Sequence, residues 1–405
     1  MANTLKFGAG QWATKEGSTL AYNDENDNYK PLPFDFTRAS NATVVNKAGL
    51  IETVGNGIPR IDFLGNTQGA LKLEPQRSNL VPYSQEFTGW TLTNVVETPN
   101  ALISPDGTQN ASKFVTNSNG VDIKYASIPV IEDTTYTFSF YCNYIGGLGL
   151  QGRFYDNTNG ANIEYYDYMS QLEEGKWKRV TRTFTTPIGC TNIQVWYLAS
   201  SSSNPVTAYY WGAQLEEESY ATSYIPTNGS TATRQADTAN GSGNSEVFND
   251  SEGVLFADIS NISENQTTTV AFSLSDGSTS NAVSVYYFGT SGLYYDIFNS
   301  DGTRSGNTPM TKIQQTYNNK ISLKYKSGDI ALWVNGFEVD TNVGTLSLNG
   351  LSELSFDYGN GGFPFYGKTK EIAYYDEILT DAELETLTSY RSLNELVTEL
   401  NLNTL

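Results

Sequence analysis

The segment TYTFSFYCNY, residues 135–144, carries the alternation that decides the fold class. Tyr136, Phe138, Phe140 and Cys142 stand at every second position, and Thr135, Thr137 and Ser139 alternate with the first three of them. This period of two is that of a β-strand with one face in a hydrophobic core. We therefore expect Tyr136, Phe138, Phe140 and Cys142 to point into the core of a sheet protein.

The composition extends this prediction to the whole chain. The chain has 405 residues, enough for two or three domains, and it includes 27 Tyr and 36 Gly. Aromatic and β-branched residues suit strands, while Gly and Asn suit the turns between them. Ser327-Gly328 and Asn335-Gly336 have the composition of tight hairpin turns. The sequence therefore predicts a mainly β protein built from antiparallel strands.

Charge and residue usage exclude several classes of function. The formal net charge of −20 repels phosphate backbones, so we expect no nucleic-acid binding. No apolar run is long enough to span a bilayer and the N-terminus has no apolar signal region, so we expect no membrane insertion. The absence of His rules out His-dependent triads and His-ligated metals. For Cys142 and Cys190 we favour buried free thiols, with a bridge left open.

Changes of pattern along the chain predict its domain organisation. The first part is irregular, two strand-rich stretches follow, and a polar stretch divides them. Near the C-terminus, Thr380 with Glu383 and Ser392 with Glu395 have the spacing of helix capping boxes. The expected parts are an N-terminal anchor or assembly arm (1–76), a first β-sandwich (77–227), a linker (228–246), a second β-sandwich (247–390) and a short C-terminal helix (391–405).

Two stretches resemble a leader that is common in bacteriophage structural proteins. They are FTRASNATVVNKAGLIETVGNGIPRIDF and LKLEPQRSNLVPYSQEFTGW. TRQAD, residues 233–237, comes after WGAQLEEESYATSYIPT, and together they resemble the end of the module that follows the leader in those proteins. The residues that carry this resemblance are Phe36, Arg38, Ser40, Gly49, Pro59, Arg60, Glu74, Arg77, Asn79 and Leu80.

The two strand-rich stretches also resemble known modules. WGAQLEEESYATSYIPT, residues 211–227, resembles the end of a jelly-roll carbohydrate-binding module. The region from SEGVLFADIS to EIAYYDEILTDAELETL resembles a laminin-G or concanavalin-A-like sandwich. Together these resemblances imply a virion structural protein, such as a head or tail fibre or spike, that adheres to host or environmental glycans. The alternatives are a tail depolymerase and a carbohydrate-binding protein outside the virion.

Strand alternation suggests a glycan-binding or interface surface on the first sandwich. In AYYWGAQLE it favours Trp211 inside and Tyr210 with Gln214 outside. If the neighbouring strands share that sheet, their outer face carries aromatic and amide groups suited to sugars or to a subunit interface. The candidate residues are Gln151, Arg153, Tyr155, Gln194, Trp196, Tyr210 and Gln214.

Acidic residues raise two further possibilities, calcium binding and hydrolysis. The calcium candidates are Asp156, Asp167, Glu216, Glu217 and Glu218, but their spacing is not that of an EF-hand loop, so we expect no cofactor and leave calcium open. Hydrolysis of glycosides needs two carboxylates, and the candidates for it are Glu164, Asp167, Asp276 and Asp296. No spacing singles out one pair, so we expect no enzyme activity and no catalytic residue.

Exposed apolar sequence predicts self-association. Leu393, Leu396, Val397 and Leu400 would form one stripe on the C-terminal helix. We expect a homotrimer, because phage fibres and spikes are commonly trimers, with the N-terminal arm contacting other virion proteins. The competing interpretation is that the stripe packs back on the second sandwich. The expected location is the virion, after synthesis in the cytoplasm of a host bacterium.

Overall fold

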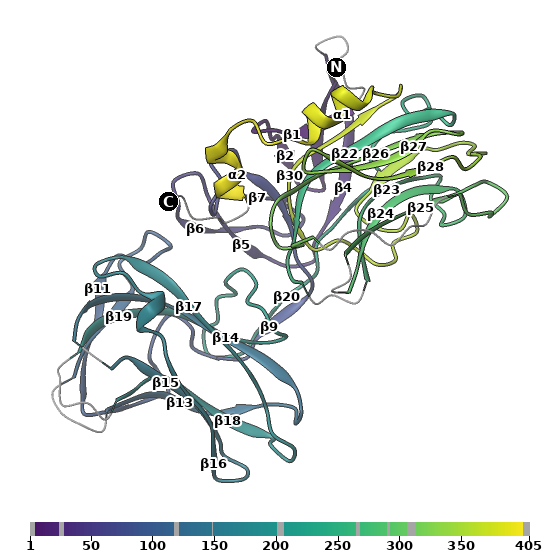
Figure 1. The fold of residues 1–405 in the computed structure, drawn as a ribbon. Coiled ribbons are helices and arrows are strands. Elements are labelled where there is room, and N and C mark those ends of the chain that lie inside the picture. The colour runs from purple at the N-terminus through teal and green to yellow at the C-terminus, as the bar shows by residue number, and fades with distance from the viewer. Residues whose placement is uncertain are drawn as a thin grey trace. The chain divides into compact units, whose positions relative to one another are not determined.

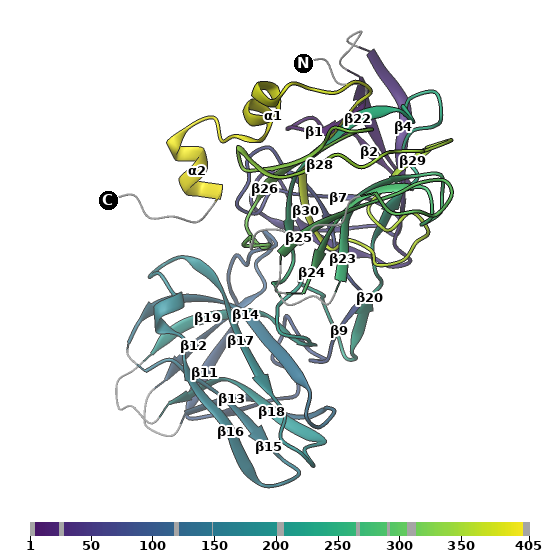
Figure 2. The same ribbon diagram turned by 45° about the vertical axis from the view of Figure 1, so that its right-hand side comes forward.

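The chain is mainly β, as the sequence predicts, with two short helices near its C-terminus. The computed structural model describes residues 5–23, 28–116, 121–147, 149–200, 206–264, 268–289, 292–305 and 313–399. No helix in these ranges is long and apolar enough to cross a membrane. Figure 1 and Figure 2 show the ribbon from two sides.

Two compact units share the chain, and one is an insertion in the other. Unit 1 comprises residues 1–49, 54–75 and 236–405, and unit 2 comprises residues 50–53 and 76–235. The chain therefore builds part of unit 1, leaves it at Pro75 for most of unit 2, and returns at Ala236.

Unit 1 contains a large sheet and a small sheet that enclose one core. In the described ranges the large sheet has twelve strands and the small sheet has four. Side chains from both sheets, such as Leu255, Ile259, Val285 and Ile297, are fully buried in the same cluster. The large sheet contains β1 (Leu5–Gly8), β2 (Thr14–Lys15), β3 (Ser18–Asn23), β4 (Asn28–Thr37), β7 (Arg60–Asp62), β8 (Ala70–Leu73), β21 (Thr238–Asn240), β22 (Glu252–Asn261), β26 (Asn319–Lys326), β27 (Ile330–Val334), β28 (Phe337–Asn342) and β30 (Gly367–Tyr375). The small sheet contains β23 (Thr268–Ser275), β24 (Ala282–Phe288), β25 (Gly292–Phe298) and β29 (Glu353–Ser355).

Unit 2 is a sandwich of two five-stranded antiparallel sheets around an aromatic core. Tyr136, Phe138, Phe140 and Cys142 all lie in this core, as their alternation predicts. Both Cys142 and Cys190 are buried free thiols. One sheet contains β10 (Trp90–Thr93), β13 (Val121–Pro129), β18 (Asn192–Ser200), β15 (Gln151–Asp156) and β16 (Ala161–Asp167). The other contains β11 (Val95–Leu102), β12 (Ala111–Thr116), β19 (Thr207–Glu217), β14 (Thr135–Gly146) and β17 (Trp177–Thr185).

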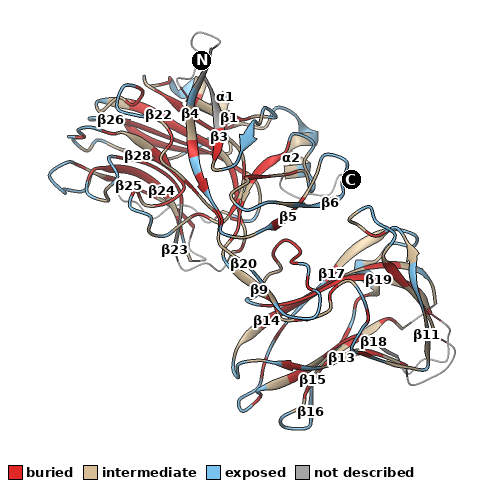
Figure 3. Cartoon of the chain, turned by 180° about the vertical axis from the view of Figure 1, so that it is seen from behind, coloured by how far each residue is buried: buried red, intermediate tan, exposed pale blue. Residues whose placement is uncertain are grey.

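Short elements complete the two units. Figure 3 marks the buried residues in red, and they run along the strands of both units. The remaining short elements are β5 (Ala42–Val45), β6 (Ile51–Val54), β9 (Arg77–Asn79), β20 (Ala232–Arg234) and the 3-10 helix Met169–Gln171.

The N-terminal segment is not the separate arm expected from its irregular composition. Strand β1 pairs along its whole length with β30, so that Phe7 lies opposite Ile372. Strand β4 pairs with β21, so that Phe36 lies opposite Ala239. The segment orders itself against strands about 200 to 370 positions away in the sequence, and its side chains Leu5, Phe7, Phe34 and Phe36 are buried in the unit 1 core.

The polar stretch 228–246 is also more ordered than the expected linker. Strand β20 pairs with β9, with Arg234 opposite Arg77, in unit 2. Strand β21 belongs to the large sheet of unit 1. The stretch lacks large apolar residues, and it is held by backbone pairing and by buried polar side chains such as Arg234, Asp237 and Ser242.

A buried ion network joins the leader to the point where the chain re-enters unit 1. Asp237 accepts hydrogen bonds from Arg38 Nη1 at 3.0 Å, from the Glu74 N–H at 2.8 Å, and from Arg60. Arg60 Nη1 also donates to Glu74 at 2.6 Å. Burial alone would lower the pKa of Arg60, but the carboxylates of Glu74 and Asp237 raise it above its usual value. The network therefore keeps the Arg60 guanidinium charged inside the fold.

Loss of the shared carboxylate should destabilise unit 1. In the Asp237→Ala variant two buried guanidinium groups lose a partner, which costs about 3–5 kcal/mol. Chemical denaturation followed by tyrosine and tryptophan fluorescence measures this change. The control Glu252→Ala removes a carboxylate that pairs with Lys326 at a partly exposed site, and such a pair contributes no more than about 1 kcal/mol. Equal effects of the two variants would contradict the role given to the network.

Two helices cover the outer face of the large sheet. Helix α1 (Asp381–Thr388) begins with the predicted capping box of Thr380 and Glu383. Its Leu384 is buried with Val254, Phe256 and Trp333 on that face. Helix α2 (Leu393–Glu399) follows, and the Ser392 hydroxyl accepts the Glu395 N–H at its start.

Helix α2 is held by charged groups of unit 1. Lys320 Nζ lies 2.7 Å from Glu395, and Lys370 pairs with Glu399. Of the predicted apolar stripe, Leu393 is exposed and Leu396 and Val397 are half-buried, while Leu400 lies outside the described residues. Helix α2 is therefore attached to unit 1 through its charged side chains, and Leu393 of the stripe stays exposed.

Asp258 should make stability fall as pH rises. Burial raises its pKa to about 7, although Lys370 and Lys320 oppose the shift, as against 3.8 for an ordinary Asp. Folding therefore favours the protonated carboxyl. The resulting stability is complete below about pH 4 and is lost as the pH rises through about 7.

The Asp258→Asn variant tests the direction of this pH dependence of stability. It should melt at a higher temperature than the parent at pH 8, and the difference should shrink below pH 5. Hydrogen bonds from Thr303 lower the pKa of the exposed Asp301, so Asp301→Asn should instead lose a little stability at neutral pH. Calorimetry across pH 4–9 measures both, and a stabilising effect of Asp258→Asn that is largest at low pH would contradict the assignment.

Candidate functional site

Strands β15 and β18 of unit 2 form the predicted outer surface together. Strand β19, which was expected to share this surface, lies in the other sheet. Strands β15 and β18 pair directly, with Arg153 opposite Trp196 and Tyr155 opposite Gln194. Their other faces supply Phe154, Ile193, Val195 and Tyr197 to the core, as alternation predicts. The side chains of Gln151, Arg153, Tyr155, Gln194 and Trp196 therefore share one outer surface, as expected.

Tyr210 and Gln214 do not belong to this surface, because β19 lies in the opposite sheet. The Tyr210 ring is buried in the core and its hydroxyl lies 2.9 Å from that of Tyr168. Gln214 is buried too, and its Oε1 accepts the Ile225 N–H at 2.7 Å. These two candidates are structural residues, which corrects the prediction for them.

A bulge in β19 explains the wrong face assignment. Gly212 has a φ of +71°, and the pairing with β14 shifts register between Ser139 and Tyr141. Alternation therefore changes phase, so that Tyr210 before the bulge and Ala213 after it both enter the core. Trp211 is fully buried as predicted, but under the tail of its own segment, where its ring contacts those of Tyr141 and Tyr224.

Arg153 is the centre of the remaining surface. Its guanidinium carbon lies 4.1 Å from the ring centroid of Trp196, 4.6 Å from that of Tyr155 and 5.0 Å from that of Tyr165. Its Nε donates to Asn162 Oδ1 at 2.5 Å. In the ranges that the structure describes, no carboxylate forms an ion pair with Arg153. The positive charge is thus stabilised by aromatic rings and one amide rather than by an acid.

The surroundings of Trp196 differ from an open aromatic platform. Lys124 Nζ lies 4.7 Å from its ring centroid, so Lys124 and Arg153 both cover the ring, which is 6% exposed. Trp196 Nε1 donates to Gln194 Oε1 at 3.0 Å, and Gln194 Nε2 donates to Asn157 at 2.7 Å. The ring that faces solvent is Tyr165, which is 52% exposed.

The sequence prediction did not include Lys124 and Tyr165, although strand alternation in their segments places both side chains on the outer face. In VDIKYASIP, Val121 and Ile123 are core residues, and the same alternation places Asp122 and Lys124 outside. Lys124 lies 3.6 Å from Asp122, so its charge is partly matched. The surface that we call the Arg153 face comprises Lys124, Gln151, Arg153, Tyr155, Tyr165, Gln194 and Trp196.

The acidic candidates for calcium or catalysis mostly have partners inside the protein. Arg182 pairs with Glu164, and the Met169 N–H donates to Asp167 at 2.8 Å. Glu216 is buried and accepts the Thr222 hydroxyl at 2.7 Å, while burial raises its pKa. Asp156 accepts the backbone N–H groups of Thr158 and Asn159. Among the described residues, no group of three or more acidic or Cys side chains is arranged to hold a metal ion.

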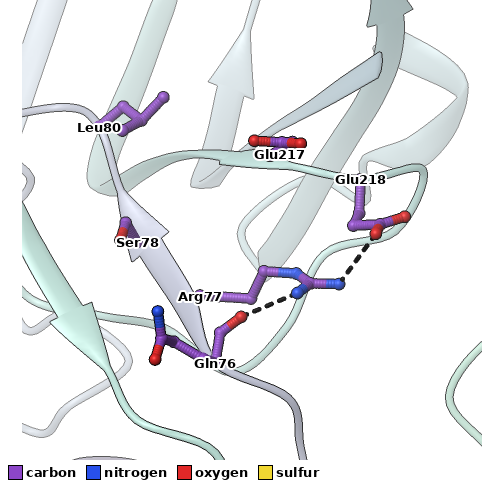
Figure 4. Close-up of a pocket in the computed structure, with 6 residues that line it drawn as sticks. All are labelled: Gln76, Arg77, Ser78, Leu80, Glu217 and Glu218. Atoms are coloured by element: carbon purple, nitrogen blue, oxygen red, sulfur yellow. Dashed lines mark hydrogen bonds and ion pairs between the residues drawn. The ribbon is translucent and has the colours of Figure 1, made fainter. Parts of the chain in front are cut away.

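A polar pocket of about 330 Å³ lies elsewhere in unit 2 (Figure 4). Its cation, Arg77, lies 3.5 Å from Glu218 and donates to the Tyr220 hydroxyl at 2.8 Å. The positive charge of Arg77 is therefore already matched. The lining residues are Gln76, Arg77, Ser78, Leu80, Glu217 and Glu218.

Structural comparison finds partial likenesses to carbohydrate-binding modules. The sequence matches no protein-family model and no curated protein. The Ruminococcus gnavus IT-sialidase CBM40 is 19% identical with a TM-score of 0.31, over 37% of this chain and 94% of that one. Domain 4 of AbnA, an arabinanase from Geobacillus stearothermophilus solved with arabinotriose, is 16% identical with a TM-score of 0.32, over 42% and 83%. A CBM4 structure is 14% identical with a TM-score of 0.24, over 32% and 79%.

Proposed function

We propose that the chain is a carbohydrate-binding protein and that the Arg153 face of unit 2 takes a sugar bearing a carboxylate. The observation that carries this proposal is the position of Arg153, a cation without an acidic partner in the described ranges of a chain with net charge −20. A guanidinium group can bind a carboxylate through two parallel hydrogen bonds. The ring of Tyr165 beside it offers a flat surface for the apolar side of the sugar.

An ordinary solvated surface would explain these residues less well. A long Arg side chain on such a surface has many conformations, whereas Arg153 is confined among three rings and Asn162. Confinement before binding lowers the entropy lost when the ligand is bound. A subunit interface would also use Tyr, Trp and Arg, so the test must separate glycan binding from self-association.

The Arg153→Gln variant should lose binding to carboxylated glycans. A hydrogen bond to a charged group contributes about 1.5–3 kcal/mol, so affinity should fall roughly tenfold or more. Arrays of sialylated, uronic-acid and neutral oligosaccharides measure this, with the parent and variant compared at equal folded fraction. The control Lys178→Gln removes one positive charge from β17, in the other sheet, and should bind as the parent does. Equal binding by all three proteins would overturn the proposal.

The same assay addresses the enzymatic alternative. We infer a binding rather than a hydrolytic role, because Glu164 is paired with Arg182 and Asp296 with Arg304. Bound polysaccharide should therefore release no new reducing ends. Release that disappears in variants of these carboxylates would support a depolymerase instead.

We further propose that the chain is a structural component of a bacteriophage particle, such as a head or tail fibre or spike, and that it forms a homotrimer. The support is the resemblance of the leader and of TRQAD to phage structural proteins. In this proposal the contact with other virion proteins uses the N-terminal segment as part of the folded surface of unit 1, rather than as a free arm.

Two measurements test the virion proposal. Antibody against the purified chain should label intact particles in electron micrographs. Light scattering at micromolar concentration should give three times the mass of one 44.5 kDa chain. Unlabelled particles would overturn the virion role, and a single-chain mass would overturn the trimer while leaving glycan binding untouched.

A further inference from the structure

A second surface with aromatic and polar side chains lies on unit 1, on the outer face of the small sheet. Strands β24 and β25 pair so that Tyr286 lies opposite Tyr294 and Ser284 lies opposite Asp296. The alternate residues of both strands are in the core: Val283, Val285, Tyr287, Leu293, Tyr295 and Ile297. The side chains of these two cross-strand pairs therefore lie on the face of the small sheet that is turned away from the core.

A neutral polar group forms the centre of this surface. Asp296 is 3% exposed, and the guanidinium of Arg304 binds it through two nitrogens, with Nε at 2.6 Å. The Tyr358 hydroxyl donates to its other oxygen at 2.9 Å. Because Asp296 neutralises Arg304, this cluster carries no net charge. Its Arg304 side chain is still 37% exposed and can offer N–H donors to a ligand.

A row of aromatic rings in mutual contact lies beside the polar centre. The Tyr286 and Tyr294 rings stack with centroids 5.5 Å apart, and the Phe288 ring lies 5.8 Å from that of Tyr294. Tyr358 contacts Tyr286 at 6.3 Å and Phe363 at 6.3 Å, each edge to face. Phe288 and Phe363 are both about half exposed, at 49% and 58%. The rings thus form a continuous row from Phe288 to Phe363 beside a hydrogen-bonding centre.

The loop that carries Tyr358 and Phe363 is built to lie close to the sheet. Gly359 has a φ of +81°, and a Cβ there would lie 2.6 Å from the Ser275 hydroxyl. The Ser273 hydroxyl donates to the Asp357 carbonyl oxygen at 2.6 Å. Glycine at this position therefore allows the loop to approach the sheet and brings Tyr358 to Asp296.

Phe363 itself has a backbone that a bulky residue rarely adopts. Its φ of +53° lies in the left-handed region, which disfavours side chains with a Cβ and favours Gly or Asn. The exposed Phe363 ring adds nothing to the core, and its ring contact is with Tyr358 of the same loop. Strain of this kind gathers where a ligand is held.

One buried hydroxyl remains without a partner beside the polar centre. Ser284 is fully buried, and its Oγ has no hydrogen-bond partner among the described residues. It lies opposite Asp296 on the same face. Burial of a polar atom without a partner costs free energy, so a ligand or a water that bonds it would be favoured.

We propose that this surface is a second carbohydrate site and that it takes a neutral sugar. The row of aromatic rings would cover the apolar faces of the sugar rings, while Arg304, Tyr358 and Tyr286 would bond their hydroxyls. A neutral ligand is favoured because Asp296 already matches the one cation. The site deepens the proposed glycan binding but uses no residue of the Arg153 face, so each site can fail alone.

The experiment uses the full chain with the first site disabled by Arg153→Gln. This variant should still bind neutral oligosaccharides on an array of uncharged glucose, galactose, mannose and arabinose oligomers, and calorimetry with the best of these gives its affinity. Adding Phe363→Asn removes the ring but keeps a residue that tolerates φ near +53°. Loss of an aromatic contact should weaken binding about fivefold or more. Adding Tyr294→Ala instead should do the same.

Phe337→Ala in the Arg153→Gln background is the matched control, because Phe337 is an exposed ring of β28, in the large sheet of unit 1. It should bind neutral sugars as the background does. The inference is overturned if neutral binding is absent, is lost with Arg153→Gln alone, or survives both Phe363→Asn and Tyr294→Ala in proteins that melt normally. Binding of carboxylated glycans by the parent chain would leave the first site standing in those cases. If the chain binds neutral glycans but no carboxylated glycans, the first proposed site is overturned and the second is supported.

Discussion

Unit 1 depends on one buried carboxylate, that of Asp237, which two guanidinium groups and a backbone N–H share. The chain leaves unit 1 at Pro75 and returns to it at Ala236, so the ends of the unit 2 insertion must lie close together. The Asp237 N–H also donates to the Glu74 carbonyl oxygen at 3.0 Å, which joins the residues just before and just after the insertion. Buried charges of this kind are stable only as a complete set. We therefore expect the leader, the ends of the insertion and strand β21 to become ordered together.

The same residue type has two roles on the outer faces of the two units. Arg153 has aromatic rings and an amide around it, whereas Arg304 is bound by Asp296 through two nitrogens. The first arrangement leaves a charge to be matched by a ligand, and the second leaves hydrogen-bond donors without a net charge. Two sites of different chemistry would let one chain bind both carboxylated and neutral sugars.

Much of the fold could be predicted from strand alternation. The assignment of faces is sensitive to the phase of that alternation, because a shift by one residue moves every side chain to the other face. The prediction held for Phe138 and Phe140 in β14, which pairs in unbroken register with β17, and for Val195 in β18, which pairs regularly with β15. It also held for Tyr197, although the pairing of β18 with β13 shifts register at this residue. It failed for Tyr210 because Gly212 inserts a bulge that no alternation rule contains. It also failed for the N-terminal segment, since Phe7 and Phe36 become buried only when strands far along the sequence pair with theirs. On the Arg153 face, alternation placed Arg153 and Trp196 correctly, but the covering of Trp196 by Lys124 depends on which strands are neighbours.

The residues that carry the resemblance to phage proteins turn out to have structural tasks. Arg38, Arg60, Glu74 and Asp237 form the buried network. Asn79 is also buried, and its side chain donates to the carbonyl oxygens of Ala213 and Ile225 and accepts the Leu215 N–H. Such a sequence pattern reflects the buried contacts at the ends of the unit 2 insertion. Substitution of any of these residues would leave buried polar groups unpaired. The pattern says little about what the chain binds. Specificity has to lie on the faces that the pattern does not touch, and both proposed sites use residues outside it.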